Sequence, residues 1–208
     1  MKTLIVAATR AELALFYQHY HLPEYDFVES KHFDLLITGV GMVATAFALG
    51  QYLTKPYRLV ANFGIAGCFD RNIELGTLLN ITEDSLAELG AENGDEFLTI
   101  TDLGFGKNHF IARSIKKIDL PSAKGITVNC VTGSEQSIKN LKTRFNPTTE
   151  SMEGAAVFYA CKQVDIDCIQ IRSVSNYVEP RNKENWKIGL AIKNLNSWAI
   201  SFIEEMNS

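Results

Sequence analysis

The sequence predicts an α/β fold, a three-layer αβα sandwich in which helices cover both faces of a central sheet. Two observations predict it: short apolar runs stop abruptly at glycine or a small polar residue, and amphipathic segments alternate with these runs. Continuous apolar runs are typical of strands buried on both faces, and their alternation with helices is typical of layered α/β proteins. With 208 residues, the chain is expected to form a single domain over residues 1–208.

Six segments fit strands of such a sheet. The clearest are apolar runs that end at a small polar residue or at glycine: Leu4–Ala8, Phe33–Thr38 and Arg58–Phe63. Further candidates are Thr77–Thr82, Ile126–Val131 and Cys168–Val174. Short apolar runs bounded by turn residues indicate buried strands.

Five segments have the periodicity of amphipathic helices: Ala11–Tyr20, Met42–Leu53, Ser134–Phe145, Glu153–Val164 and Glu184–Met206. The last is the clearest, because apolar residues recur along it every three or four positions from Ile188 onward. The polar stretch Glu83–Asp102 fits neither pattern and is predicted to be an insertion or a lid.

Composition argues against several classes of protein. Lysine and arginine total 20 and aspartate and glutamate total 24, so the net charge of −4 argues against a nucleic-acid partner. No apolar run reaches the roughly 18 residues that span a bilayer, so we expect a cytoplasmic protein with no membrane partner. The four cysteines have no CxxC spacing and the four histidines have no ligand spacing. We therefore expect no metal, no disulfide and no cofactor.

Two glycine motifs follow predicted strands. Gly39–Ala44 has the spacing G-x-G-x-x-A of a dinucleotide-binding turn, with Gly41 as its second glycine. That function needs an acidic residue about 20 positions later, yet residues 35–69 contain no aspartate or glutamate. A tight strand-to-helix turn is therefore the favoured interpretation. Gly64–Gly67 is predicted to be a second glycine turn, and the two turns together predict a ligand lying against the backbone at Gly41 and Gly64.

Polar side chains near strand ends are the candidates for chemistry, because sites in α/β folds lie at the carboxyl ends of strands. Glu12 could accept a proton from water, although a carboxylate in a first helical turn is also a favourable charge–dipole placement. The same alternative applies to Glu153, whose carboxylate could accept hydrogen bonds from vicinal sugar hydroxyls. Asn176 offers a donor and an acceptor that suit a nucleobase edge or, alternatively, a turn. Arg172 is expected to be an internal ion-pair partner.

Five motifs then form a pattern, because they occur in order along nearly the whole chain. They are Glu12 after the first strand, Thr38–Ala44, Asn62–Gly67, Ser151–Ala155 and Arg172–Asn176. In this order they resemble the nucleoside phosphorylase/nucleosidase superfamily. The resemblance implies a twisted mixed sheet, a small-molecule purine nucleoside as ligand, and a homo-oligomer, a dimer or larger.

Within the superfamily, one segment is informative about the branch. Ser175–Asn182 followed by Trp186 is most similar to hydrolases of a hypoxanthine nucleoside in an alternative route to menaquinone. The resemblance implies that Glu12 deprotonates the attacking water, Glu153 binds the ribose hydroxyls and Met152 packs against the ribose.

The resemblance also has departures. Asn176 stands where adenine-specific nucleosidases have an aspartate that protonates the purine N7, and its amide suits the 6-oxo group of hypoxanthine instead. Ile65 replaces a serine, and Gln136 falls where an aromatic residue would stack on the base. Arg181, or else Lys183, is the candidate to meet an acidic 5′ substituent. In related enzymes a neighbouring subunit helps to close the 5′ pocket, and Phe105 or His109 could be the contributed residue.

Three alternatives to this hydrolase stay open. A nucleosidase for methylthioadenosine, adenosylhomocysteine or the 6-amino analogue of the hypoxanthine nucleoside is disfavoured by Asn176. A purine nucleoside phosphorylase needs a cluster of basic residues for phosphate, and only Arg10 lies near Glu12 in the sequence. A non-catalytic nucleoside-binding module is allowed by the fold, but it does not need two carboxylates.

Overall fold

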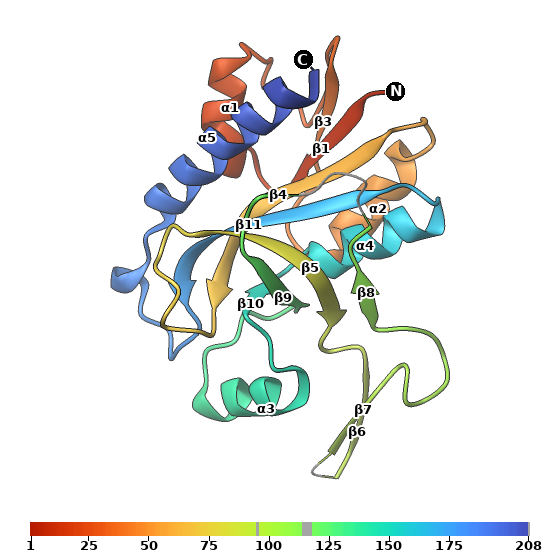
Figure 1. Ribbon diagram of the computed structural model, residues 1–208. Coiled ribbons are helices and arrows are strands. Elements are labelled where there is room, and N and C mark those ends of the chain that lie inside the picture. Colours follow the sequence, from red (N-terminus) through yellow and green to blue (C-terminus); the bar gives the residue numbers. More distant parts are fainter. Residues whose placement is uncertain (95, 114–117, 208) are drawn as a thin grey trace.

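The computed structural model describes residues 1–94, 96–113 and 118–207, and its backbone alternates between strands and helices as the sequence predicts (Figure 1). Most strands form one sheet in the order β10-β9-β5-β11-β4-β1-β3-β2, and β8 pairs with β5. The strands are β1 (Thr3–Ala7), β2 (Phe27–Glu29), β3 (Phe33–Ile37), β4 (Leu59–Cys68), β5 (Leu78–Leu86), β8 (His109–Ile111), β9 (Ser122–Thr127), β10 (Thr149–Ser151) and β11 (Cys168–Tyr177). β1, β3, β4 and β11 run parallel, whereas β2 and β5 are antiparallel to β3 and β11, which confirms a mixed sheet.

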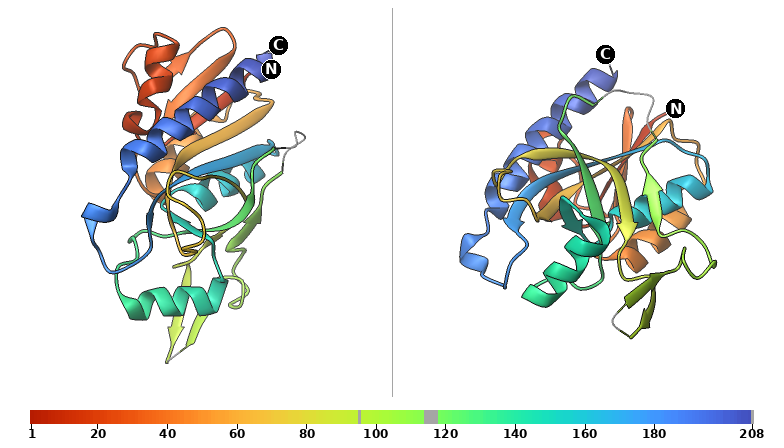
Figure 2. Two further views of the ribbon diagram at one scale, coloured as in Figure 1. Left: turned by 60° about the vertical axis from the view of Figure 1, so that its left-hand side comes forward. Right: turned by 60° about the horizontal axis from the view of Figure 1, so that its bottom comes forward.

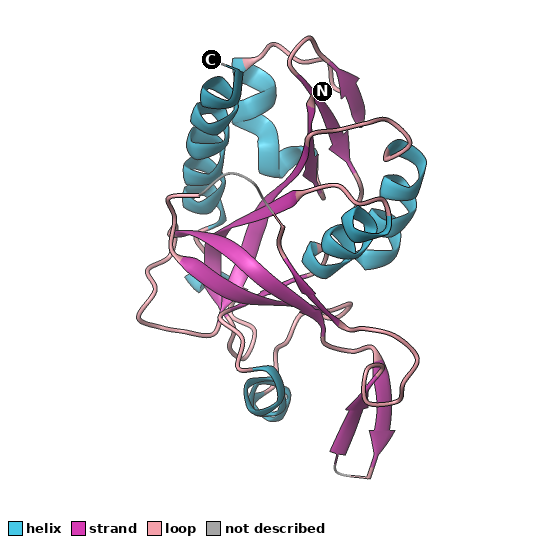
Figure 3. Ribbon diagram, turned by 45° about the vertical axis from the view of Figure 1, so that its right-hand side comes forward, coloured by secondary structure: helices cyan, strands magenta, loops and turns pink. Residues whose placement is uncertain are grey.

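Helices cover both faces of this sheet, which confirms the three-layer prediction (Figures 1 and 3). One face carries α1 (Ala14–His19) and α5 (Ile188–Asn207), and the other carries α2 (Met42–Tyr52) and α4 (Gly154–Gln163). Alternate side chains of β1 supply the two cores: Ile5 packs on the α1/α5 side and Leu4 on the α2/α4 side, both fully buried. In the described part of the chain, no helix is both long and apolar enough to cross a membrane.

The sheet also closes on itself at one end. β10 pairs in parallel with β9 and in antiparallel fashion with β4, so β4, β11, β5, β9 and β10 form a ring of five strands. α3 (Glu135–Phe145) precedes β10 and lies outside the three layers (Figure 2). The sequence does not predict this closure, because β10 has only 3 residues and pairs with a strand far away in the chain.

Two predicted strand ends are wrong. β4 continues through Gly64–Gly67, which the sequence predicts as a turn, because β11 pairs with it along this whole segment. β11 likewise continues to Tyr177, with a bulge between Val174 and Asn176. A Cβ at Gly64 would lie 2.0 Å from Nη1 of Arg172, so glycine is needed here for close packing rather than for a turn.

Three further boundaries differ from the predictions. The first predicted helix is divided into a 3-10 turn, Arg10–Leu13, and α1. The last predicted helix begins only at Ile188, because extended backbone at Trp186 separates α5 from a 3-10 turn at Lys183–Asn185. β9 ends at Thr127, so the strand predicted over 126–131 is shifted toward the N-terminus.

The polar stretch Glu83–Asp102, predicted to be an insertion or a lid, contains a projecting hairpin, and its described residues do not cover the cavity of its own chain. Its first residues complete β5, and the rest contains β6 (Gly90–Asn93) and β7 (Glu96–Thr99), a separate hairpin that extends away from the large sheet (Figure 1). Among the described residues of this stretch, none lines the cavity discussed below.

Candidate active site

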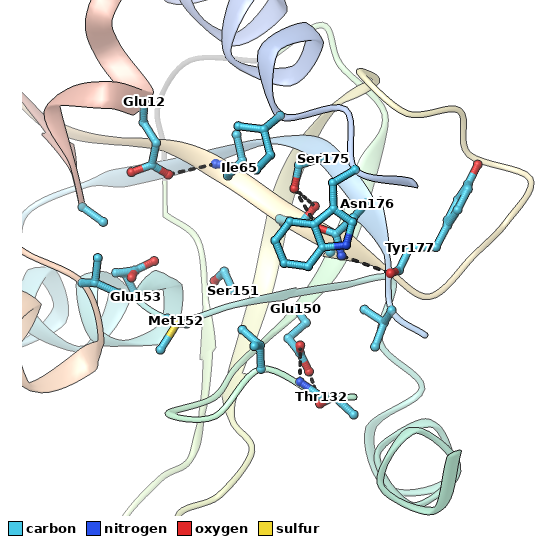
Figure 4. Close-up of a pocket in the computed structure, with 18 of the residues that line it drawn as sticks. Glu12, Ile65, Thr132, Glu150, Ser151, Met152, Glu153, Ser175, Asn176 and Tyr177 are labelled. Carbon is cyan, nitrogen blue, oxygen red and sulfur yellow. Dashed lines mark hydrogen bonds between the residues drawn. The ribbon is translucent and has the colours of Figure 1, made fainter. Parts of the chain in front are cut away.

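A cavity of about 410 Å³ opens at the carboxyl ends of β1, β4 and β11, beside β10 (Figure 4). This is the end of the sheet at which the sequence predicts the site. Its walls come from these strands, from the loops around residues 131–133 and 178–186, and from the first turns of α5. The predicted site residues that line it are Glu12, Ile65, Met152, Glu153, Asn176 and Arg181.

Glu12 is held at one end of the cavity by three hydrogen bonds. Its Oε2 accepts from the backbone N–H and from the hydroxyl of Thr9, both at 3.0 Å, and its Oε1 accepts from the N–H of Ile65 at 3.1 Å. The contacts with Thr9 form a capping box, in which the residue before the 3-10 turn bonds with the third residue of that turn. Local sequence therefore orients Glu12, and β4 supplies the third donor from a distant part of the chain.

Burial makes Glu12 a stronger base than an exposed glutamate. The residue is 9% exposed, and loss of hydration raises the pKa of its carboxyl. The positive charge of Arg172 and the hydrogen bond from Ile65 oppose this rise, whereas the negative charge of Glu153 adds to it. A carboxylate with a raised pKa is better suited to accept a proton from water.

Arg172 is a site residue that sequence reasoning assigned to a different role. It is 2% exposed, and its guanidinium lies over Gly64 near Oε1 of Glu12. Within the described part of the chain, its Nε and Nη2 have no hydrogen-bond partner, so these two nitrogens do not form the expected internal ion pair. Its charge acts on Glu12 and on the buried Asp84. The sequence feature that could have indicated this position of Arg172 is Gly64, because only glycine leaves room there for the guanidinium.

Glu153 faces the same end of the cavity as Glu12 and has a backbone partner of its own (Figure 4). It is 8% exposed and precedes α4, and its Oε1 accepts from the N–H of Gly41 at 2.9 Å. Gly41 has φ +93° and Gly39 has φ +83°, so the motif at 39–44 is the tight turn that was favoured. Gly41 does not line the cavity; its amide is used to hold Glu153.

The other end of the cavity is lined by Asn176. Its Oδ1 accepts from the hydroxyl of Ser175 at 2.8 Å, and its Nδ2 donates to the carbonyl of Tyr177 at 3.0 Å. An amide has two N–H donors and two acceptor lone pairs, so one of each stays available to a ligand. Gly67 of β4 lies beside Asn176, and a Cβ there would come within 3.3 Å of its Nδ2.

Glu150 also lines this end, and sequence reasoning did not single it out. It is 5% exposed and accepts hydrogen bonds from the backbone N–H of Thr132, at 2.8 Å, and from the Thr132 hydroxyl. Burial raises the pKa of its carboxyl, and the two bonds from Thr132 oppose that rise. The sequence could have indicated Glu150 only by its position two residues before Met152, a predicted site residue. The pairing of β10 with β4 is what brings it to the cavity.

Some predicted residues lie elsewhere. Gln136 is exposed on α3 and donates to Asn140, so it cannot stack on a base in this cavity. Gly64 and Lys183 do not line the cavity either; the first packs against Arg172 and the second lies in a 3-10 turn. Arg181 does line it, with its guanidinium 5.2 Å from the ring centre of Trp186.

The predicted subunit contacts also lie away from the cavity of their own chain. Phe105 is 80% exposed, and His109 bonds through Nδ1 with the hydroxyl of Ser85 at 3.0 Å. Their contribution to a neighbouring subunit stays a prediction.

The fold and the site together define an α/β enzyme with two buried carboxylates facing one cavity, an arrangement suited to cleaving glycosidic bonds. A family model described as the phosphorylase superfamily matches residues 2–204, and the chain belongs to this family.

Two relatives carry the same printed name. The futalosine hydrolase of Streptomyces coelicolor is 34% identical over 172 residues, which cover 76% of this chain and 73% of that protein. The futalosine hydrolase of Thermus thermophilus is 28% identical over 174 residues, covering 78% of this chain and 77% of that protein.

Solved structures agree in fold. A methylthioadenosine/adenosylhomocysteine nucleosidase from Helicobacter pylori has a TM-score of 0.82 at 14% identity, with 99% of both chains covered. The futalosine hydrolase of Helicobacter pylori has a TM-score of 0.81 at 14% identity, covering 99% of this chain and 98% of that one. At this level of identity the likeness describes the fold alone.

Proposed function

We propose that this chain hydrolyses the N-glycosidic bond of futalosine, releasing hypoxanthine and dehypoxanthine futalosine in the alternative pathway of menaquinone biosynthesis. The observation that carries the proposal is the similarity to futalosine hydrolases over three quarters of the chain, 34% identity in one case. The site supports it, because Glu12, Glu153 and Asn176 line one cavity. The sequence alone favoured the same reaction.

In the proposed reaction, Glu12 and Glu153 act on the sugar. As the bond from C1′ to N9 stretches, its electron pair moves to the base and positive charge develops on the ribose, which the carboxylate of Glu153 stabilises while accepting from the ribose hydroxyls. Water attacks C1′ and gives a proton to Glu12. Met152 and Ile65 form apolar walls beside the sugar.

Asn176 is proposed to act on the leaving base. Its free N–H can donate to the 6-oxo group or N7 of hypoxanthine, both of which are acceptors, and so stabilise the negative charge that the base acquires. The amide has no proton to give up at neutral pH, so the departing base takes its proton from solvent. The 5′ substituent of futalosine carries a carboxylate, and Arg181 is the proposed partner for it.

Hydrolysis is favoured over phosphorolysis by the charges around the cavity. Of the described residues that line it, Arg181 alone is basic. Arg10, the basic residue nearest to Glu12 in the sequence, donates instead to the carbonyl of Glu24 and lies 3.9 Å from Asp26. Phosphate binding needs several such donors, and the reaction with water needs none.

A homo-oligomer is also proposed, supported by an exposed apolar row. Val43 and Phe47 are 79% and 68% exposed and lie four residues apart on α2, which puts them on one helix face, and Val40, 56% exposed, lies in the turn that precedes this helix. Val40 also lines the cavity, so a subunit on this row would border the site. Phe47→Glu is expected to shift the mass measured by light scattering to that of a monomer; an unchanged mass would contradict this interface.

The test of the activity is chromatography of purified protein incubated with futalosine, inosine and methylthioadenosine, each with and without phosphate. Hypoxanthine released from futalosine regardless of phosphate is the expected result. Adenine from methylthioadenosine would indicate the adenine-type nucleosidase, and release only with phosphate would indicate a phosphorylase. No release from any nucleoside would indicate a binding module.

The proposed cytoplasmic location is supported by the four free thiols.

A further inference from the structure

The buried carboxylate of Glu150 has no role in the reaction proposed above, although it lines the cavity. Each of its oxygens accepts one hydrogen bond from Thr132, so each keeps an acceptor lone pair. A carboxylate that is 5% exposed loses most of its hydration, and such a group is costly unless it gains further donors. The side chain therefore suits a ligand that presents an N–H.

Strand pairing places Glu150 across from Asn176. In the sheet, Glu150 of β10 is paired with Gly67 of β4 on one side, and Asn176 of β11 is paired with the same glycine on the other. Two strand spacings separate the outer backbones by about 10 Å. Both side chains line the cavity, and so does Gly67 (Figure 4 draws Glu150 and Asn176). A Cβ at Gly67 would come within 2.9 Å of Val178 and 3.3 Å of Nδ2 of Asn176, so glycine lets these side chains pack against β4 here.

The bases that could lie in the cavity differ in the pattern of donors and acceptors along one edge. A 6-oxopurine such as hypoxanthine has an N–H at N1 and acceptors at O6 and N7, so a carboxylate and an amide donor complement it. Adenine has a lone pair at N1 and an amino group at position 6, so its N1 would face the carboxylate lone pairs. A site that leaves such groups unpaired rejects the wrong ligand strongly.

We infer that Glu150 selects a 6-oxopurine base, its carboxylate accepting from the N1–H while Asn176 donates to O6 or N7. The inference rests on the proposed function, since it assigns the base of the proposed substrate. It divides recognition between two strands, β10 and β11, that both pair with β4.

The test is calorimetric titration of hypoxanthine and of adenine, two bases of nearly the same shape, into wild type, Glu150→Gln and Glu88→Gln. Glutamine can still accept from the Thr132 N–H, but it places a donor where a carboxylate oxygen was. Wild type should bind hypoxanthine at least 10-fold more tightly than adenine, and Glu150→Gln should lower this ratio roughly 10- to 100-fold. Glu88→Gln is the matched control, because Glu88 is exposed and accepts from the N–H of Asn129.

A second variant separates selection from a structural role. Glu150→Asp keeps an acceptor, so it should keep the preference for hypoxanthine even where both affinities fall, and it is the fallback if the glutamine variant does not fold. An unchanged ratio in Glu150→Gln, a ratio lost in Glu150→Asp, or a wild type that does not prefer hypoxanthine would overturn the inference. Base binding is measured without turnover, so a failure to hydrolyse futalosine overturns the proposed function and leaves this result readable by itself.

Discussion

The two ends of the cavity are built by different means. At the sugar end, backbone amides hold the carboxylates: Ile65 and Thr9 donate to Glu12, and Gly41 donates to Glu153. At the base end, hydroxyls share this role with the backbone: Asn176 is held by the hydroxyl of Ser175 and the carbonyl of Tyr177, and Glu150 by the hydroxyl and the N–H of Thr132.

This difference indicates which end of the cavity is set by backbone geometry and which end a single substitution can alter. A backbone N–H is present whatever the side chain, so the sugar end is tied to strand and helix geometry. At the base end, side-chain hydroxyls supply a larger share of the contacts, those of Ser175 and Thr132, so single substitutions can alter which base is accepted. We therefore expect changes at the sugar end to reduce catalysis, and changes at the base end to redirect it.

The largest effect is expected for Glu12→Gln. The amide oxygen can still accept from the Ile65 N–H and the amide NH2 can donate to the Thr9 hydroxyl, but the amide cannot accept a proton from water, so kcat for futalosine should fall by roughly 10²- to 10⁴-fold. KM should change little, which steady-state kinetics can measure. A variant that loses affinity and keeps kcat would remove Glu12 from the role of base.

Arg172→Met should have the next largest effect and sharpens the comparison at the sugar end. Without this positive charge the pKa of Glu12 rises further, so a smaller fraction of the base is ionised at a given pH. We expect the acidic limb of kcat/KM against pH to move to higher pH, and each unit of movement lowers kcat/KM on that limb by about 10-fold. An unmoved limb would mean that Arg172 acts in some other way.

The melting temperature provides the control for this variant. The guanidinium nitrogens Nε and Nη2 have no partner among the described residues, so replacing the side chain with one of similar volume should cost little stability. A large fall in melting temperature would instead indicate a structural role for Arg172.

Asn176→Asp changes the base end and leaves the sugar end intact. An ionised carboxylate beside the O6 and N7 acceptors of hypoxanthine is repulsive, so kcat/KM for futalosine should fall by about 10-fold or more. The 6-amino analogue should lose less or gain, because its amino group can donate to the new carboxylate. Competition between the two nucleosides measures the change, and an unchanged ratio would contradict the role given to Asn176.

The smallest effect on activity is expected for Asp84→Asn, which lies behind the site. Asp84 is fully buried and accepts from Thr127 at 2.9 Å and from Gln170 at 3.0 Å. Burial raises its pKa to about 6 from the ordinary value of 3.8. The stability linked to this group is therefore complete below about pH 4 and is lost as pH rises toward 6.

Asparagine does not titrate, so the Asp84→Asn variant does not lose this stability as the pH rises. Relative to wild type, its free energy of unfolding should rise by up to about 3 kcal/mol between pH 4 and pH 7, as measured by urea denaturation. The Oε1 of Gln170, which has no partner among the described residues, can accept from the new amide. Glu24→Gln, at an exposed carboxylate, is the control, and a flat difference between wild type and Asp84→Asn would show that Asp84 does not titrate near pH 6.

Local sequence determined most helices and strands and the two carboxylates at the sugar end of the site. Apolar runs and helical periodicity depend on neighbouring residues, so they identified most strands and helices to within a few positions. The capping relation of Thr9 and Glu12 is local, and so is the place of Glu153 before α4. The order of the motifs determined the family, because it does not depend on contacts between them.

Only the tertiary structure decided the rest, because it depends on which distant strands become neighbours. Gly64–Gly67 looks like a turn in the sequence, and pairing with β11 makes it strand. Gln136 stands at the position in the sequence where a base-stacking residue is expected, yet it lies exposed on α3. The closure of β10 onto β4 placed Glu150 opposite Asn176, a long-range pairing that no local pattern encodes.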